Sequence, residues 1–253
     1  MRYSGYLTHG GADLLTLDAV TIRQDDFLLC AALQITAGAR VAVIGPSGAG
    51  KSTLLGAIAG FVPLAEGRII WANADISGQS PALRPISVLF QDNNLFPHLS
   101  AFDNVALGLR PSLRLTKTER AQVMTALDRV GLKGYEARRP AQLSGGQQSR
   151  VALARVVLQR KPLVLLDEPF SALGPALKAE MLQLVADICS ETGATLLMVT
   201  HDISDARAIA DQTILVADGI AEGPFETAHL LDNPPASLRA YIGASLSGPP
   251  DRR

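Results

Sequence analysis

Apolar positions alternate with polar ones near the start of the chain and gather into short, wholly apolar runs further on. Residues 15–22 alternate as a half-buried strand does, and residues 27–35 form a second strand-like run. Residues 41–44 then lead through a glycine-rich turn into a helical pattern at residues 54–59. Two more short strands are predicted at residues 67–72 and 86–90. The first third of the chain therefore mixes short antiparallel strands with a strand–loop–helix unit.

The pattern changes after residue 91. Residues 92–150 contain proline turns and helical periodicity but no strong strand-like run. Thr116 and Glu119 have the spacing of a capping box, which opens a helix whose apolar positions share one face. Gly131 is a suitable end for that helix. We interpret this stretch as a helical insertion.

Strand-like runs return in the last third. They cover residues 163–166, 195–200 and 213–217 and alternate with helical patterns, one of which begins at Pro175 and ends before Gly193. Such alternation predicts a mainly parallel sheet covered by helices.

These patterns predict an α/β fold with an N-terminal antiparallel β region and a helical subdomain. The expected division is a flexible lead at 1–13, an α/β core at 14–91 and 151–222, a helical subdomain at 92–150 and a short helical C-terminal tail at 223–253.

Composition narrows the class of protein. Of the 253 residues, 47% are apolar and the net charge is −1, as expected for a folded globular chain. No basic tract appears, which argues against nucleic acid as a main partner. The sequence shows no apolar run long enough to span a bilayer and no signal-peptide pattern, so we expect a cytoplasmic chain. The two cysteines, Cys30 and Cys189, lie in apolar surroundings and are predicted to be core residues.

A phosphate-binding loop follows the strand at residues 41–44. The segment fits G-x-x-x-x-G-K-[ST]. Its glycines let backbone N–H groups turn toward a polyphosphate, and the helix that follows presents its positive end to the same anion. Lys51 can reach the β- and γ-phosphates, and the Ser52 hydroxyl can bind Mg²⁺. The predicted nucleotide-binding residues are Gly45, Pro46, Ser47, Gly48, Ala49, Gly50, Lys51, Ser52 and Thr53.

Two carboxylates follow the apolar run at residues 163–166. Open α/β sheets place ligands at this end of a strand. Asp167 can share a Mg²⁺ ion with Ser52, and Glu168 can activate a water for in-line attack on the γ-phosphate. The alternative, an acidic turn without chemistry, is less attractive beside a phosphate loop.

A second glycine-rich segment precedes another helix. Ser144 is a good N-cap, so its neighbours lie at a helix N-terminus, where an anion can bind. One nucleotide has a single γ-phosphate, so a second anion site suggests that two chains face each other and each offers this segment to the other's nucleotide. The residues are Ser144, Gly145, Gly146 and Gln147.

Taken together, these segments resemble the ATP-binding subunits of ABC transporters, in the correct order over residues 14–243. The resemblance identifies GPSGAGKS as Walker A, LSGGQ as the signature and LVLLDE as Walker B with the catalytic base. It implies ATP and Mg²⁺ as cofactors, ATP hydrolysis as the activity and a homodimer as the working form.

The resemblance also gives roles to residues that the pattern alone does not. It implies that Gln91 contacts Mg²⁺ and the attacking water, and that His201 contacts the γ-phosphate and positions Glu168. It further implies a groove for a membrane permease lined by Asn93, Asn94, Leu95 and Phe96.

Finer likeness points to the thiamine importer ATPases, chiefly in residues 84–96 and 104–109. It implies peripheral attachment at the cytoplasmic face of a membrane and an indirect periplasmic or surface solute-binding protein. Two alternatives stay open, namely import of another solute such as a metal or polyamine, and a soluble ABC ATPase outside transport.

Three departures from the family pattern affect these expectations. The D-loop, residues 171–174, ends in Gly174 where the family has aspartate, so coupling between the two nucleotide sites is expected to be weaker. The signature tail reads QQSR at residues 147–150 where the family commonly has QRQR, so a basic charge is missing there. No aromatic residue occupies the expected adenine-stacking position, and Phe27 is the nearest candidate.

Overall fold

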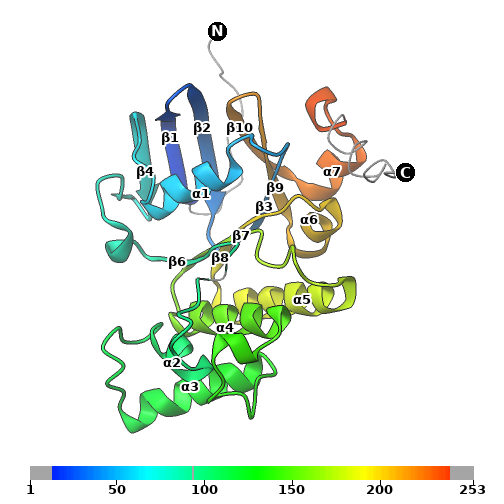
Figure 1. Cartoon of the computed structure of the whole chain (residues 1–253). Helices are drawn as coiled ribbons and strands as arrows, with labels where there is room; N and C mark the ends of the chain where they lie inside the picture. The colour runs from blue at the N-terminus through cyan, green and yellow to red at the C-terminus, as the bar shows by residue number, and fades with distance from the viewer. Residues whose placement is uncertain (1–12, 93, 240–253) are drawn as a thin grey trace.

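One mixed sheet organises the molecule. The computed structural model describes residues 13–92 and 94–239, and Figure 1 shows the sheet in the upper half with a group of helices below it. The strand order is β5-β4-β1-β2-β10-β9-β3-β8-β7-β6. The strands are β1 (Asp13–Gln24), β2 (Phe27–Thr36), β3 (Arg40–Ile44), β4 (Glu66–Trp71), β5 (Ala74–Asp75), β6 (Ile86–Leu89), β7 (Leu163–Asp167), β8 (Thr195–Val199), β9 (Gln212–Ala217) and β10 (Ile220–Glu226).

The sheet has an antiparallel and a parallel section. Strands β5, β4, β1 and β2 pair antiparallel, whereas β9, β3, β8, β7 and β6 pair parallel with one another. Strand β10 joins the two sections, because it pairs parallel with β2 and antiparallel with β9. The parallel strands are almost wholly apolar because helices cover both of their faces.

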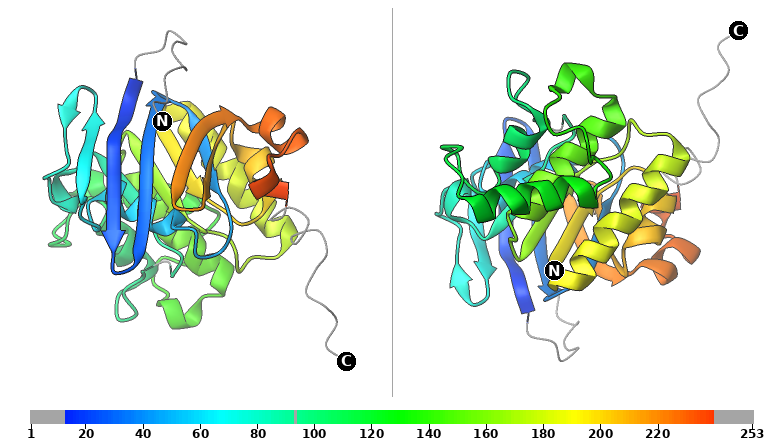
Figure 2. Two further views of the ribbon diagram at one scale, coloured as in Figure 1. Left: turned by 90° about the horizontal axis from the view of Figure 1, so that it is seen from above. Right: turned by 90° about the horizontal axis from the view of Figure 1, so that it is seen from below.

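Successive side chains of β3 point into two different cores. Val41 and Val43 pack on the side of α1 (Lys51–Ala59), while Ala42 and Ile44 pack on the opposite side, against helices from the second half of the chain. Figure 2 shows the β1–β2 hairpin in front when the molecule is seen from above, and the helices in front when it is seen from below. The remaining helices are α2 (Ala101–Ala106), α3 (Lys117–Arg129), α4 (Gly145–Leu158), α5 (Pro175–Thr192), α6 (Ile203–Ile209) and α7 (Thr227–Asp232), with short 3₁₀ turns at Pro81–Leu83 and Pro140–Gln142.

A third core lies within the helical lobe, which consists of α2, α3 and α4. Val105, Val123 and Leu127 are fully buried there. Helix α4 serves two cores, since Val151 faces the helical lobe while Leu153 packs with the parallel sheet. The lobe is therefore attached to the sheet through a shared helix.

The predicted elements are found close to their expected positions. The capping box of Thr116 and Glu119 is present, and α5 begins at Pro175 and ends at the C-cap Gly193. Cys189 is buried, which raises the pKa of its thiol to about 11, and Cys30 is partly buried.

Two predicted domain boundaries fall inside elements of the structure. A boundary at residue 150 cuts α4 in its middle, because the helix runs from the signature segment to Leu158 without a break. The boundary at residue 223 lies within β10, which continues to Glu226 before α7 begins. The sequence pattern did not predict this strand, because Gly223 and Pro224 are residue types that are unfavourable in strands.

The ends of the chain fall outside the described residues, so the flexible lead, apart from Asp13 in β1, and the end of the tail stay predictions. Among the described residues, no helix is long and apolar enough to cross a bilayer.

Candidate functional site

The phosphate loop lies between β3 and α1, at the carboxyl end of a central parallel strand. Gly45 has a φ of 150°, and a Cβ at this position would lie 1.9 Å from the carbonyl oxygen of Val216 on β9. Gly50 has a φ of 101° and packs against the ring of Phe27. Both glycines are therefore required by close approach as well as by conformation.

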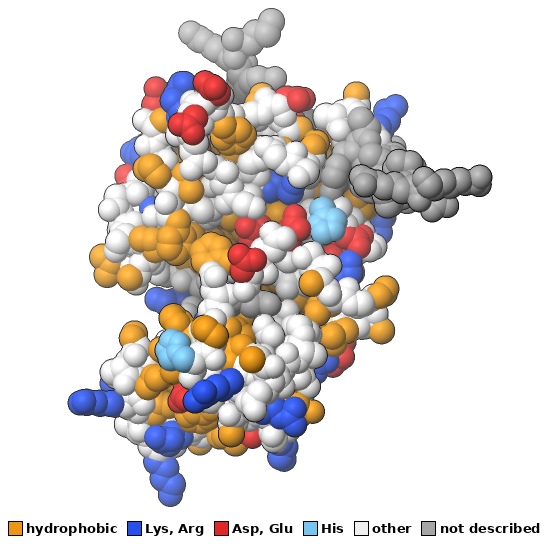
Figure 3. Space-filling model, in the orientation of Figure 1, with side chains coloured by type: hydrophobic (Ala, Val, Ile, Leu, Met, Phe, Trp, Pro, Cys, Tyr) orange, Lys and Arg blue, Asp and Glu red, His pale blue; other side chains and the backbone are white. Residues whose placement is uncertain are grey.

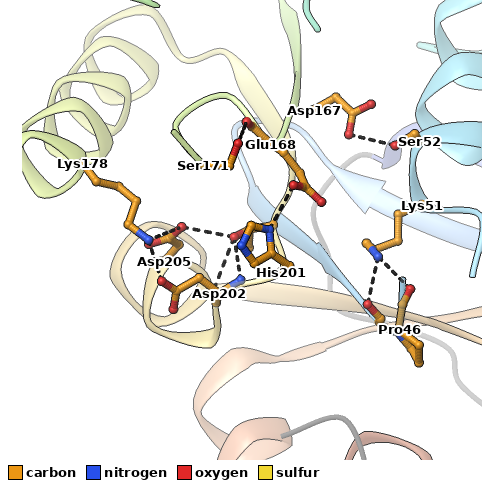
Figure 4. Close-up of polar contacts among 12 residues, drawn as sticks. Pro46, Lys51, Ser52, Asp167, Glu168, Ser171, Lys178, His201, Asp202 and Asp205 are labelled. Atoms are coloured by element: carbon orange, nitrogen blue, oxygen red, sulfur yellow. Dashed lines mark hydrogen bonds and ion pairs between the residues drawn. The ribbon is translucent and has the colours of Figure 1, made fainter. Parts of the chain in front are cut away.

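Lys51 is held at the mouth of this loop. Its Nζ donates hydrogen bonds to the carbonyl oxygens of Gly45 at 2.9 Å and Pro46 at 2.8 Å (Figure 4). Burial lowers the pKa of Lys51, and the carboxylates of Glu168 and Asp167 oppose this shift. The buried ammonium group donates to neutral carbonyl oxygens, and it would bind charged phosphate oxygens more strongly.

The side chains of Ser52 in α1 and Asp167 at the end of β7 are in direct contact. The Ser52 hydroxyl donates a 3.0 Å hydrogen bond to Oδ1 of Asp167, which ends β7. Burial raises the pKa of Asp167, although the bond from Ser52 opposes this, and the nearby Glu168 charge raises it further. A carboxylate whose charge is costly to bury is stabilised by a cation.

These two residues fit a magnesium ion. A hydroxyl and a carboxylate are hard oxygen donors of the kind that Mg²⁺ prefers. Among the described residues, no group of three or more His, Cys, Asp or Glu side chains could hold a metal by itself. An ion bound by Ser52 and Asp167 would thus rely on phosphate oxygens for further ligands.

Glu168 and His201 form the second polar pair of the site. Oε2 of Glu168 lies 3.0 Å from Nδ1 of His201, and their side chains are 22% and 57% exposed. Glu168 has a φ of 44°, in the left-handed region, and its amide donates to the carbonyl oxygen of Val199 on β8. Such sparsely populated backbone conformations cluster at functional sites, and Glu168 is the residue expected to be catalytic.

Gln91 follows β6 at the carboxyl edge of the parallel strands, where the other site residues lie, and it is exposed.

The loop after Gln91 is fixed by Asn104 of α2, which is fully buried. The Asn104 side chain accepts a hydrogen bond from the amide of Phe96 at 2.8 Å and donates one to the carbonyl oxygen of Phe96 at 3.1 Å. Arg155 of α4 donates to the carbonyl oxygen of Asn94. Asn93 lies outside the described residues. The sequence pattern missed Asn104, because its role depends on burial.

The signature turn, residues 144–147, forms the start of α4. The Ser144 hydroxyl accepts from the amide of Gln147 at 3.3 Å, and the Gln147 side chain accepts from the amide of Ser144 at 3.0 Å. This is a second capping box, whose S-x-x-Q spacing is visible in the sequence. These bonds stay within the helix start, and Gly146 faces Leu173 and Leu177 near the start of α5.

Predicted site residues thus fall into two groups. Lys51, Ser52, Asp167, Glu168 and His201 lie together at the carboxyl ends of the parallel strands, as Figure 4 shows. The signature turn belongs to the helical lobe and has its contacts there and with α5.

Gly174 does not use the freedom of a glycine. Its φ of −65° and ψ of 157° are open to any residue, and a Cβ there would meet nothing within 4 Å. It occupies the N-cap of α5 without a side-chain hydrogen bond. The D-loop change therefore removes a side chain without altering the backbone.

Comparison with known proteins places these features in a family. A family described as ABC transporter matches residues 30–171. A curated protein of Cereibacter sphaeroides, named thiamine import ATP-binding protein ThiQ, is 59% identical over 230 residues, which cover 91% of this chain and all of that protein. The protein of the same name from Yersinia pestis is 48% identical over 219 residues, covering 87% of this chain and 93% of that protein.

Solved structures agree with the fold. A dimeric, post-hydrolysis state of the ATP-binding cassette MJ0796 bound to ADP and Pi has a TM-score of 0.75 at 31% identity and covers 85% of this chain and 99% of its own. The ADP form of the cassette MJ1267 has a TM-score of 0.81 at 23% identity, covers 92% and 99%, and supports the fold alone. The chain therefore belongs to the ABC transporter family, as one of its ATP-binding and ATP-hydrolysing subunits.

Proposed function

We propose that this chain is the ATPase of a thiamine importer and works as a homodimer with Mg²⁺ and ATP. It would attach to the cytoplasmic face of a membrane through a permease, which receives thiamine or its phosphates from a periplasmic or surface solute-binding protein. The observation that carries the substrate is the 59% identity with the Cereibacter sphaeroides protein over that protein's whole length.

The homodimer follows from the separation of the two groups of site residues. The phosphate loop is built on β3 and α1, whereas the signature turn makes its contacts with its own helix and with α5. An ATP on the loop of one chain would be completed by the signature turn of another. The dimeric state of MJ0796, which is similar over 85% of this chain, supports this arrangement.

The residues of the first group divide the chemistry among themselves. Lys51 exchanges the carbonyl oxygens of Gly45 and Pro46 for phosphate oxygens, at little cost because both sets are acceptors. Glu168 accepts a proton from the attacking water, and His201, bonded to Glu168, keeps its carboxylate in place. Mg²⁺ held by Ser52, Asp167 and Gln91 would neutralise charge on the phosphates.

Exposed apolar side chains support a docking surface for the permease. Phe96 is 47% exposed although Asn104 fixes its backbone, and Phe61, 56% exposed, packs edge-on against Phe90 with ring centres 5.4 Å apart. Figure 3 shows hydrophobic side chains gathered where the sheet and the helical lobe meet. An exposed aromatic residue on a fixed loop, such as Phe96, favours a protein partner.

Uptake of labelled thiamine tests the substrate. Deleting the gene should reduce uptake to background, and the wild-type chain should restore it whereas Glu168→Gln should not. Unchanged thiamine uptake with loss of metal or polyamine uptake would show that the substrate is wrong. Recovery of ribosomes or DNA, in place of a polytopic membrane protein, in a pull-down from solubilised membranes would contradict transport.

Ser144→Arg tests the dimer. The bulky cation should block the opposing nucleotide, so ATP binding to the monomer should persist while ATP-dependent dimerisation and hydrolysis are lost. Light scattering with and without ATP measures the first property, and phosphate release measures the second. Hydrolysis equal to that of the wild type would rule out a signature turn that acts on the partner's nucleotide.

A further inference from the structure

The first turn of α5 follows the D-loop and carries Lys178. Its amide makes the first backbone hydrogen bond of the helix, to the carbonyl oxygen of Gly174, so the side chain starts from a well-fixed backbone. Figure 4 shows this side chain reaching from α5 to the two aspartates of the segment that carries His201.

Lys178 forms ion pairs with both aspartates. Its Nζ lies 2.5 Å from Oδ2 of Asp202 and 3.0 Å from Oδ1 of Asp205, and Asp205 is only 9% exposed. Burial alone would raise the pKa of Asp202, but hydrogen bonds from Lys178 and Ser204 outweigh it and bring that pKa to about 2. The Asp202–Lys178 pair is therefore charged throughout the physiological range.

The aspartates fix the backbone on both sides of His201. Asp205 accepts a 3.1 Å bond from the hydroxyl of Thr200, and the amide of Asp202 donates a 3.0 Å bond to the same hydroxyl. The amide of Thr200 in turn donates to the carbonyl oxygen of Val43. Lys178 thus holds the residues on both sides of His201, Asp202 directly and Thr200 through Asp205. The ring of His201 in turn contacts Glu168.

The same turn of α5 touches the signature turn. A Cβ at Gly146 would lie 2.5 Å from the Leu177 side chain and 3.5 Å from that of Leu173, so both leucines pack closely on this glycine. Slightly further along α5, Glu180 pairs with Arg150 of α4 at 2.8 Å. Leu177 therefore contacts the signature turn, and its neighbour Lys178 contacts the two aspartates that follow His201.

We propose that Lys178 is a positioning residue that couples the signature turn to His201 through the first turn of α5. A shift of the signature turn upon meeting the partner's nucleotide moves Leu177, and Lys178 passes that movement to His201 of the same chain. This route requires no carboxylate at Gly174. It rests on the proposed homodimer, because only there does the signature turn meet a nucleotide.

Lys178→Met tests the role of the ion pairs while keeping a long apolar side chain. We expect kcat for ATP hydrolysis to fall about ten- to a hundredfold, as misplacement of a catalytic group typically does. The Kd for ATP binding to the monomer should stay within about twofold of the wild type, and the Hill coefficient for ATP should fall toward that of independent sites. Lys178→Arg keeps the charge and should restore most of kcat.

Arg207→Met is the matched control. Arg207 is an exposed residue of α6, the helix that also carries Asp205, and it pairs with Asp232. Its replacement therefore removes an ion pair of α6 without changing the contacts of Lys178. Its kcat and Hill coefficient should equal those of the wild type. Thermal unfolding of all three variants separates a loss of folding from a loss of positioning.

The outcomes separate this inference from the proposed function. A normal kcat in a folded Lys178→Met variant would overturn the role of Lys178, and failure of Lys178→Arg to recover activity would show that the charge is not what matters. An unchanged Hill coefficient with reduced kcat would reject the coupling. A wild-type chain that hydrolyses ATP without dimerising would instead contradict the proposed dimer.

Discussion

The α/β core and the helical lobe hold their functional residues by different means. In the α/β core, Glu168 is fixed by a bond to Val199, and Thr200 before His201 by a bond to Val43, so the support comes from strands distant in sequence. In the helical lobe, Ser144 is held by Gln147, three residues away.

This difference has a mechanical consequence. Support from neighbouring strands makes the nucleotide-binding core a single rigid body, because the atoms that hold the site are also core backbone. Local support lets the signature turn move together with its helix without losing its own geometry. We therefore expect movements between the two regions to be carried at their contacts, of which α4 and the first turn of α5 are the clearest.

Glu168→Gln gives the largest expected effect, on the α/β side. Removing the base should lower ATP hydrolysis by about 10²–10⁴-fold, while the amide preserves the shape of the side chain and ATP binding. Phosphate release and size-exclusion chromatography with ATP should show an inactive dimer that accumulates. Glu191→Gln, which removes an exposed partner of Arg129, is the control. Full turnover by Glu168→Gln would exclude Glu168 as the base.

Gly45→Ala tests the long-range support of the phosphate loop. The methyl group would collide with the Val216 carbonyl oxygen and require a φ of 150°, so we expect about 2–4 kcal/mol loss of stability. Gly48→Ala, whose Cβ would meet nothing within 4 Å at a φ of 77°, should cost only about 1 kcal/mol. Equal midpoints in denaturant would show that β9 yields to the loop.

Ser144→Ala tests the local support of the signature turn. Loss of the N-cap should cost about 1 kcal/mol, and Thr116→Ala at the capping box of α3 should cost about the same. Denaturant unfolding measures both. Only Ser144→Ala should also reduce ATP hydrolysis, so equal loss of activity in the two variants would indicate that helix stability alone is being measured.

Gly174→Asp has the smallest expected effect on stability. The backbone is already that of an N-cap, and an aspartate there should stabilise α5 by a few tenths of a kcal/mol. A higher melting temperature, with ATP binding unchanged, is expected. A lower one would mean that the added charge meets a carboxylate more closely than the backbone geometry implies.

Much of the site could be predicted because its motifs are continuous in sequence. The phosphate loop, the pair Asp167–Glu168 and the cap at Ser144 all lie within a few residues of the elements that place them. The predicted boundary at residue 150 falls inside α4, because this helix has two apolar faces and packs into two cores. Strand β10 was not predicted, because Gly223 and Pro224 are unfavourable in strands and its stability comes from pairing with β9 and β2.

The local chemistry can be read from the order of residues, which indicates the side chains that can bind phosphate, donate a ligand to Mg²⁺ or cap a helix. These properties depend on side-chain type and short spacing, which the chain order specifies completely. The positions of Gly45 against β9 and of Lys178 between α5 and the aspartates became visible only in the folded chain, whereas the contact of Glu168 with His201 was already implied by the family resemblance. Such contacts join segments separated by 24 or more residues, and their geometry follows from how the strands and helices pack.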